Sequence, residues 1–73
     1  MKGNITIIYE WSEDGWWVAE IAEVPGAISQ GRTKPEAKEN VLDALSELMI
    51  ARRELALKDV REPSNVETIP IAS

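Results

Sequence analysis

The stretch 33–58 constrains the fold more than any other part of the chain. Thr33-Lys34-Pro35-Glu36 is typical of a helix start, because the Thr side chain can accept the amide hydrogen of the residue three positions on, and the Glu can reach back. Apolar residues then recur at steps of three and four: Ala37, Val41, Ala44, Leu45, Leu48, Met49 and Leu55. The pattern predicts a helix about 35 Å long with one apolar side, which needs a surface to cover.

Two segments before the helix predict the start of that surface. Residues 4–11 are rich in Ile and aromatic side chains and too short for a helix, and residues 16–22 alternate in the manner of a strand. Ser12-Glu13-Asp14-Gly15 lies between them and supplies turn residues. The two segments should therefore form an antiparallel hairpin.

Two further strands complete the predicted sheet. Pro25-Gly26 is a strong turn signal, after which residues 27–30 form a short third strand. Residues 66–71 regain strand character after a connector at 63–65, and Pro70 confines this last strand to an edge. The expected fold is α+β, in the order β-β-β-α-β, with a small, mostly antiparallel sheet and one long helix on one face.

The alternation within the second strand indicates which face meets the helix. Trp17, Ala19 and Ile21 share one face, and the other face carries Glu20, whose carboxylate is costly to bury unpaired. From the first strand, we expect Ile7 and Tyr9 to join the helix-facing set, although a shift of one residue in register would invert that choice.

Length and composition limit what can stabilise such a fold. The 73 residues form a single domain, 1–73, and a core of this size yields only about 3–5 kcal/mol. The chain has neither Cys nor His, so disulfides and the usual zinc sites are excluded, and no cofactor or metal is expected. Self-association into a homodimer or a higher homo-oligomer is the expected supplement.

The charge balance narrows the choice of partners. The formal charge is −5, with 13 acidic and 8 basic residues, which disfavours direct binding to nucleic acid. The same charge suits a basic protein partner, or serves solubility alone. No long apolar run or targeting segment is evident, so a cytoplasmic protein without membrane contact is expected.

The side chains needed for catalysis are few. Without His or Cys, acid–base and nucleophilic chemistry would fall to carboxylates, Ser, Thr and Lys. Glu10 and Glu20 could face each other across the hairpin, but two carboxylates are too few for a two-metal nuclease. We therefore expect a protein that is not an enzyme.

Two features are candidates for binding. Glu39, Asp43 and Glu47 lie four residues apart and form one acidic ridge on the helix, where like charges repel. The ridge either is simply solvated or docks a basic partner. Trp16 should point away from Trp17, so its indole is either an exposed interface anchor or part of a second apolar cluster.

One set of residues is spread at fixed spacing over nearly the whole chain: Asp14-Gly15, Trp17-Val18-Ala19, Val24-Pro25-Gly26, Gly31, Thr33, Glu36-Ala37, Asn40, Ala44 and the Pro63-Ser64 connector. This pattern resembles that of the HicB-like antitoxins, a family with a partial ribonuclease H-like fold. The resemblance implies a module that pairs with itself and masks a HicA-like toxin that cleaves messenger RNA. Ala27 and Ala22 stand where the family often has Cys and Pro. Longer members continue into a DNA-binding domain, which is not expected in this chain.

Three functional hypotheses follow. The first is an antitoxin that occludes the active site of a basic HicA-like ribonuclease, with Trp16, Glu39, Asp43 and Glu47 as contact residues. The second is a stand-alone oligomeric interaction or regulatory module without a toxin. The third is a residual metal-dependent nuclease that uses Glu10.

Overall fold

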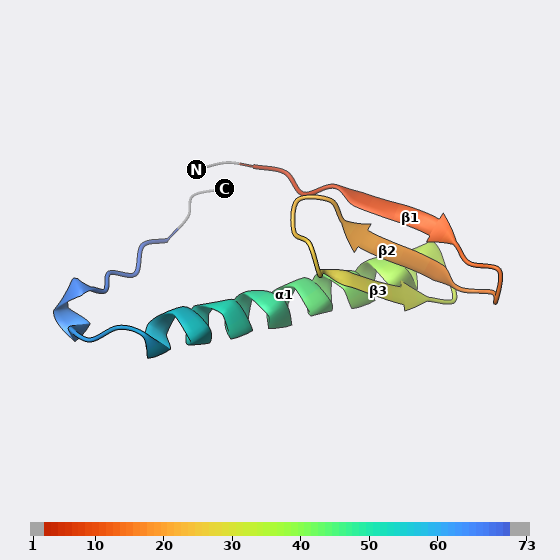
Figure 1. Cartoon of the computed structure of the whole chain (residues 1–73). Coiled ribbons are helices and arrows are strands. Elements are labelled where there is room, and N and C mark those ends of the chain that lie inside the picture. The colour runs from red at the N-terminus through yellow and green to blue at the C-terminus, as the bar shows by residue number, and fades with distance from the viewer. Residues whose placement is uncertain (1–2, 71–73) are drawn as a thin grey trace.

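Three antiparallel strands and one long helix make up the described part of the chain, residues 3–70, in a computed structural model (Figure 1). The elements are β1 (Ile7–Trp11), β2 (Trp17–Ile21), β3 (Ile28–Gly31), α1 (Lys34–Lys58) and a single 3₁₀ turn (Pro63–Asn65). The strands lie in the order β1-β2-β3, and both neighbouring pairs are antiparallel. The predicted α+β class and the β-β-β-α layout are confirmed.

Tight turns join the strands as the sequence indicates. Gly15 has a φ of 89° and Gly26 a φ of 94°, which is the left-handed region that favours glycine. In the first turn, the N–H of Gly15 donates to the carbonyl oxygen of Ser12 at 3.1 Å. Ser12 also closes the hairpin as a donor, because its own N–H donates to the carbonyl oxygen of Trp16 at 2.7 Å.

The helix begins with a side-chain cap at Thr33. The Oγ1 atom of Thr33 accepts a hydrogen bond from the N–H of Glu36 at 3.2 Å, as predicted. The return contact differs from the expected capping box, because the Glu36 carboxylate accepts from the N–H of Arg32 at 3.3 Å rather than from that of Thr33. The cap therefore holds Arg32 of the β3–α1 connection in addition to Thr33.

Gly31 allows the start of the helix to lie directly on β3. The residue is buried, and a Cβ atom placed there would lie only 2.5 Å from the amide nitrogen of Ala37 and 2.8 Å from the carbonyl carbon of Glu36. Both atoms belong to the backbone of the first helical turn, which cannot move aside cheaply. Glycine is required here for close approach.

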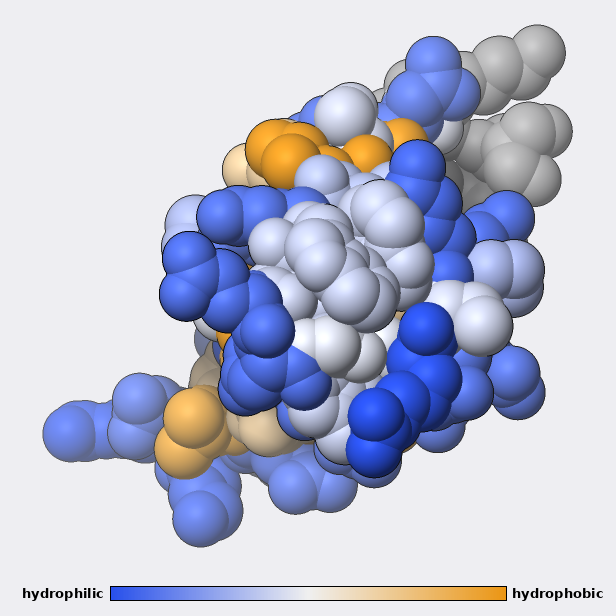
Figure 2. Space-filling view, turned by 90° about the vertical axis from the view of Figure 1, so that its right-hand side faces the viewer, coloured by the Kyte–Doolittle hydropathy of each residue, from blue (hydrophilic) through white to orange (hydrophobic). Residues whose placement is uncertain are grey.

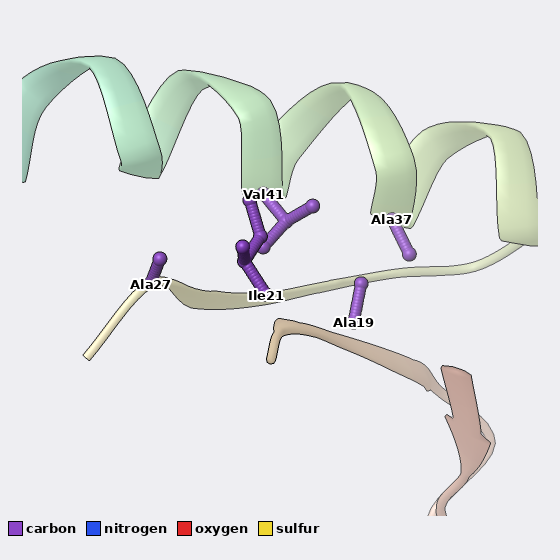
Figure 3. Close-up of a cluster of buried hydrophobic side chains, with 5 residues drawn as sticks. All are labelled: Ala19, Ile21, Ala27, Ala37 and Val41. Atoms are coloured by element: carbon purple, nitrogen blue, oxygen red, sulfur yellow. The ribbon is translucent and has the colours of Figure 1, made fainter. Parts of the chain in front are cut away.

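Five small or β-branched side chains form the core between sheet and helix. The fully buried residues are Ala19, Ile21, Ala27, Ala37 and Val41, and Figure 3 shows Val41 of the helix directed at Ile21 of the sheet. Partly buried residues surround them: Ile7, Tyr9, Trp17, Val24, Leu45 and Leu48. The predicted helix-facing sets of the first two strands are confirmed.

The helix is longer than the sheet that it covers. It packs chiefly on β3 and β2, and its second half extends past the ends of the strands (Figure 1). Arg52 makes a late contact with the sheet layer, where its Nη2 donates to the carbonyl oxygen of Pro25 at 3.3 Å. Every residue from Met49 to the helix end is exposed, and Leu55 is 62 % exposed. Met49 and Leu55, which belong to the apolar stripe predicted from the sequence, are therefore not covered by the sheet.

The expected last strand is not formed in the part of it that the structure describes. Residues 66–70 follow the 3₁₀ turn without joining the sheet, and Ile71 lies outside the described residues. Val66 and Ile69 are exposed at 43 % and 68 %. Apolar, β-branched composition was thus not sufficient to form a strand, because the connector starts at the helix end farthest from the sheet (Figure 1).

Candidate functional site

All three tryptophans lie at one end of the molecule, beside the β1–β2 turn. Trp11 ends β1, and Trp17 begins β2 as its direct cross-strand partner. Their ring centroids are 5.3 Å apart at an interplanar angle of 62°, an edge-to-face arrangement that is favourable for aromatic pairs. Trp11 is 54 % exposed, so this pair reaches the surface.

Two basic side chains lie against aromatic rings here, one from the β3–α1 connection and one from the first residue of α1. The guanidinium carbon of Arg32 is 4.0 Å from the ring centroid of Trp16. The Nζ atom of Lys34 is 4.8 Å from the Trp17 ring and 5.7 Å from the Tyr9 ring. These are cation–π distances, and each contact is worth about 0.5–1 kcal/mol at an exposed site.

We call this surface the aromatic end face and define it as Tyr9, Trp11, Trp16, Trp17, Arg32 and Lys34. Figure 2 looks onto this end: pale side chains of intermediate hydropathy fill the middle of the face, and strongly hydrophilic groups in blue border it. The fixed rings and charged tips form a surface that can contact a partner with little loss of side-chain freedom.

Trp16 has an exposure between those of the two alternatives that the sequence left open. It precedes β2 and is half-buried, with Arg32 over its ring. Sequence reasoning missed the contribution of Arg32 and Lys34. Their sequence positions could have indicated it, because both residues flank the helix cap at Thr33. The helix start lies at the same end of the sheet as the β1–β2 turn.

The acidic ridge runs along α1 on a side turned away from the sheet. Glu39, Asp43 and Glu47 are all exposed, whereas Ala37 and Val41 of the same helix are buried against the strands. None of the contacts found within residues 3–70 joins the ridge to Trp16. The two candidate features are therefore separate surfaces of the monomer.

The carboxylates do not assemble into a metal site in the described region. No group of three or more acidic side chains that could hold an ion is found among residues 3–70. Glu10 is opposite Val18, and Glu20 is opposite Ile8, so the two glutamates do not face each other directly across the hairpin. They share the outer face of the sheet only as diagonal neighbours.

Two carboxyl groups have altered titration, and both belong to turns. The Ser12 side chain hydrogen-bonds to Asp14 and, with a backbone N–H, holds the pKa of Asp14 below its ordinary value. Hydrogen bonding to Thr6, through its side chain and its backbone N–H, lowers the pKa of Glu23. Both groups are fully exposed, so these are local contacts that favour the charged form.

The helices within residues 3–70 include none with the length and apolar character that crossing a lipid bilayer requires.

Comparison with known proteins gives two relatives. The chain is 38 % identical over 71 residues to the UPF0150 protein ssl0738 of Synechocystis. The matched region covers 97 % of this chain and 99 % of that relative. It is also 40 % identical over 40 residues to the UPF0150 protein Ta0767 of Thermoplasma acidophilum. This second match covers 55 % of this chain and 58 % of that protein. No family model and no solved structure matches. The first relative is similar along almost the full length of both proteins, and the chain therefore belongs to the UPF0150 family.

Proposed function

We propose that this protein is a HicB-like antitoxin within the UPF0150 family, which neutralises a HicA-like mRNA-cleaving toxin by occluding its active site. The observation that carries the proposal is the aromatic end face. Trp, Tyr and Arg are the residue types that dominate binding energy at protein interfaces, and here they are held in place by an edge-to-face aromatic contact and by cation–π contacts. Trp16 would be the anchor that becomes buried on binding.

The acidic ridge would provide the second part of the contact. A ribonuclease needs basic side chains to hold RNA phosphates, and Glu39, Asp43 and Glu47 present three carboxylates at helical spacing to such a surface. Mutual repulsion within the ridge would be relieved on binding. The antitoxin would then exclude RNA by covering the toxin's cationic residues.

The test is coexpression with the small basic protein encoded next to this chain, followed by calorimetry and by rescue of growth arrest. We expect Glu39→Gln, Asp43→Gln and Glu47→Gln together to weaken binding by at least about tenfold, or about 1.4 kcal/mol, and to reduce its salt dependence. The matched control removes three exposed carboxylates elsewhere, through Glu13→Gln, Glu62→Gln and Glu67→Gln.

The control triple variant should bind as the unmodified protein does, because it changes net charge by the same amount without touching the ridge. Equal losses in the two triple variants would mean that only net charge matters. Absence of both binding and growth rescue would refute the proposal.

A second function, a stand-alone oligomeric module without a toxin, is favoured by the exposed second half of α1. Met49 and Leu55 continue the apolar side of the helix beyond the sheet and remain exposed at 43 % and 62 %. This function predicts a stable homo-oligomer that has no effect on any ribonuclease.

A further inference from the structure

The backbone of β1 leaves hydrogen-bonding groups open along one outer edge of the sheet (Figure 1). In an antiparallel pair, every second residue directs its N–H and C=O groups at the neighbouring strand, and the residues between direct theirs away from it. Backbone hydrogen bonds across the hairpin at Thr6 and Ser12 show which residues point inward. The outward groups are accordingly those of Ile7, Tyr9 and Trp11, which we call the β1 edge.

Nothing within residues 3–70 closes the β1 edge. No strand pairs with it, and the side-chain hydrogen bonds of that region go to other backbone groups. The register runs from Ile7 to Trp11 without a bulge, and the strand contains neither Lys nor Pro. Natural edge strands usually have one of these protecting features, because an open edge invites another strand to pair with it.

The opposite edge of the sheet, at β3, is partly occupied. The N–H of Ile21 donates to the carbonyl oxygen of Ala27 at 3.0 Å, so the outward residues of β3 are Ile28 and Gln30. The side chain of Asn40 in α1 donates to the carbonyl oxygen of Gln30 at 2.8 Å, and α1 itself packs on β3. The helix thus takes up part of this edge, and the edge most open to pairing is that of β1.

The helix-facing side chains along the β1 edge favour an apolar neighbour. Ile7 and Tyr9 are half-buried and Trp11 is 54 % exposed, so apolar side chains of an added strand would bury more of their surface. The Nζ atom of Lys34 lies 5.7 Å from the Tyr9 ring on this side and would repel a second cation. Basic side chains of an added strand therefore fit only the other side.

The outer side of the β1 edge is acidic. Glu10 is exposed there, and Glu13 and Asp14 of the following turn are exposed at the end of the strand. A Lys or Arg of an added strand beside Glu10 would form a favourable cross-strand pair of opposite charges, whereas an acidic side chain would be repelled. The two sides together fit a strand in which apolar and basic residues alternate.

We propose that the β1 edge is a strand-addition site for an extended segment of a basic partner protein, with apolar side chains toward α1 and Lys or Arg side chains on the outer side. An extended backbone has donors and acceptors at the spacing of this edge, and paired strands lie about 4.8 Å apart. A second copy of the chain fits poorly, because it would bring another Glu10 and a net charge of −5 to an acidic edge.

The inference rests on the proposed function for the identity of the partner, and it names the mode of docking. A strand of the toxin would add to β1, directly beside Tyr9 and Trp11 of the aromatic end face. Hydrogen bonds between main chains would then supply affinity, and the alternating side chains would supply specificity.

The first test uses a blocked peptide of about seven residues in which Val alternates with Lys, and a control peptide with Glu in place of Lys. In an NMR titration of the full chain, we expect the Lys peptide to bind with a Kd of about 1 mM or lower, and the Glu peptide to bind at least about tenfold more weakly. Failure of the Lys peptide to bind, or equal binding of both peptides, overturns the proposal.

Amide hydrogen exchange locates the bound peptide. The N–H groups of Ile7, Tyr9 and Trp11 should exchange rapidly in the free chain and slowly with the Lys peptide bound. Binding that leaves these amides unprotected overturns the proposal. Protection in the purified chain alone also overturns it, because a second copy or residues 66–70 would then occupy the β1 edge.

A pair of proline variants tests the backbone contact. Ile7→Pro removes one outward N–H group, and Pro is tolerated at the first residue of an edge strand. We expect this variant to bind the Lys peptide at least about tenfold more weakly. The matched control is Ile28→Pro, which removes an outward N–H group at the first residue of β3 and should bind as the unmodified chain does. Equal binding by the two variants overturns the proposal.

A pair of charge variants keeps the test valid if circular dichroism shows that Ile7→Pro does not fold. Glu10→Lys should reverse the preference between the two peptides, because the outer side of the β1 edge becomes basic. Glu20→Lys on β2 changes the net charge by the same amount and should still prefer the Lys peptide. If the two charge variants behave alike, net charge governs binding and the proposal is wrong.

The small basic protein encoded next to this chain separates this inference from the proposed function. Binding of that protein with slower exchange at the β1 edge supports both. Binding without such protection overturns strand addition and leaves the antitoxin proposal standing. If that protein does not bind and the Lys peptide still protects the β1 edge, the antitoxin proposal fails and the strand-addition site stands.

Discussion

Replacement of Gly31 by Ala tests whether close approach of helix and sheet determines this fold. The added Cβ would lie 2.5 Å from the amide nitrogen of Ala37, whereas ordinary contacts of this kind are 3.4–4 Å. The Ala37 amide is itself held by a 2.9 Å hydrogen bond to the carbonyl of Thr33. The clash can therefore be relieved only by moving the first turn of α1 away from β3.

The expected cost follows from two opposing effects. Overpacking of a tight site destabilises the folded state by about 1–3 kcal/mol. Ala also has less conformational entropy than Gly in the unfolded chain, which stabilises the folded state by about 0.4–1 kcal/mol. Gly31 has no positive φ, so no backbone strain is added. We expect a net loss of about 1–2 kcal/mol, which is roughly 5–15 °C in Tm for a domain of this size.

Thermal unfolding followed by circular dichroism and Trp fluorescence, at one fixed protomer concentration, measures this loss. Gly3→Ala is the matched control, because nothing lies within 4 Å of a Cβ at Gly3. Gly26→Ala separates conformation from crowding, since its φ is 94° but the nearest atom lies at 3.8 Å. If Gly31→Ala is as stable as Gly3→Ala, the close approach does not limit the packing and the reasoning is wrong.

Three further predictions concern the cap, the core and acid stability. Thr33→Ala should lower the free energy of unfolding by about 1 kcal/mol through loss of the helix cap, with Thr68→Ala unchanged in the same urea titration. Ile21→Ala should cost about 2–5 kcal/mol and abolish cooperative unfolding, whereas Ile28→Ala, at a site 52 % exposed, should leave a clear transition. Folding lowers the pKa of the Glu23 carboxyl group. The ionised carboxylate therefore adds its full contribution to the free energy of unfolding above the ordinary pKa of 4.5, and that contribution is lost as the pH falls through the lowered pKa of the folded state. Glu23→Gln should therefore unfold at lower urea than the unmodified protein at neutral pH, and this difference should disappear in acid.

The elements formed by local signals could be predicted from the sequence. The Thr33 cap, the Gly15 and Gly26 turns and the alternation of Trp17, Ala19 and Ile21 are all set by neighbouring residues, and all are as expected. Strand ends differ from the predicted bounds by one to three residues. Backbone hydrogen bonds between Thr6 and Ala22 and between Ser12 and Trp16 continue the pairing just beyond these ends.

The features that the sequence did not reveal depend on distances between elements. No pattern among neighbouring residues indicates that the sheet ends before Leu55, or that residues 66–70 begin too far from the sheet to join it. The same applies to Arg32 and Lys34, whose contacts with Trp16 and Trp17 arise only when the hairpin turn and the helix start meet at one end.

Three of the five core side chains are alanines, namely Ala19, Ala27 and Ala37. With so little volume between the layers, the attraction comes from the closeness of backbones more than from large interlocking groups. Bulkier residues at these positions would separate the layers instead of filling a void, so this protein should be unusually resistant to stabilisation by enlarging its interior. Engineering for heat tolerance would have to act on its loops, caps and outer surfaces.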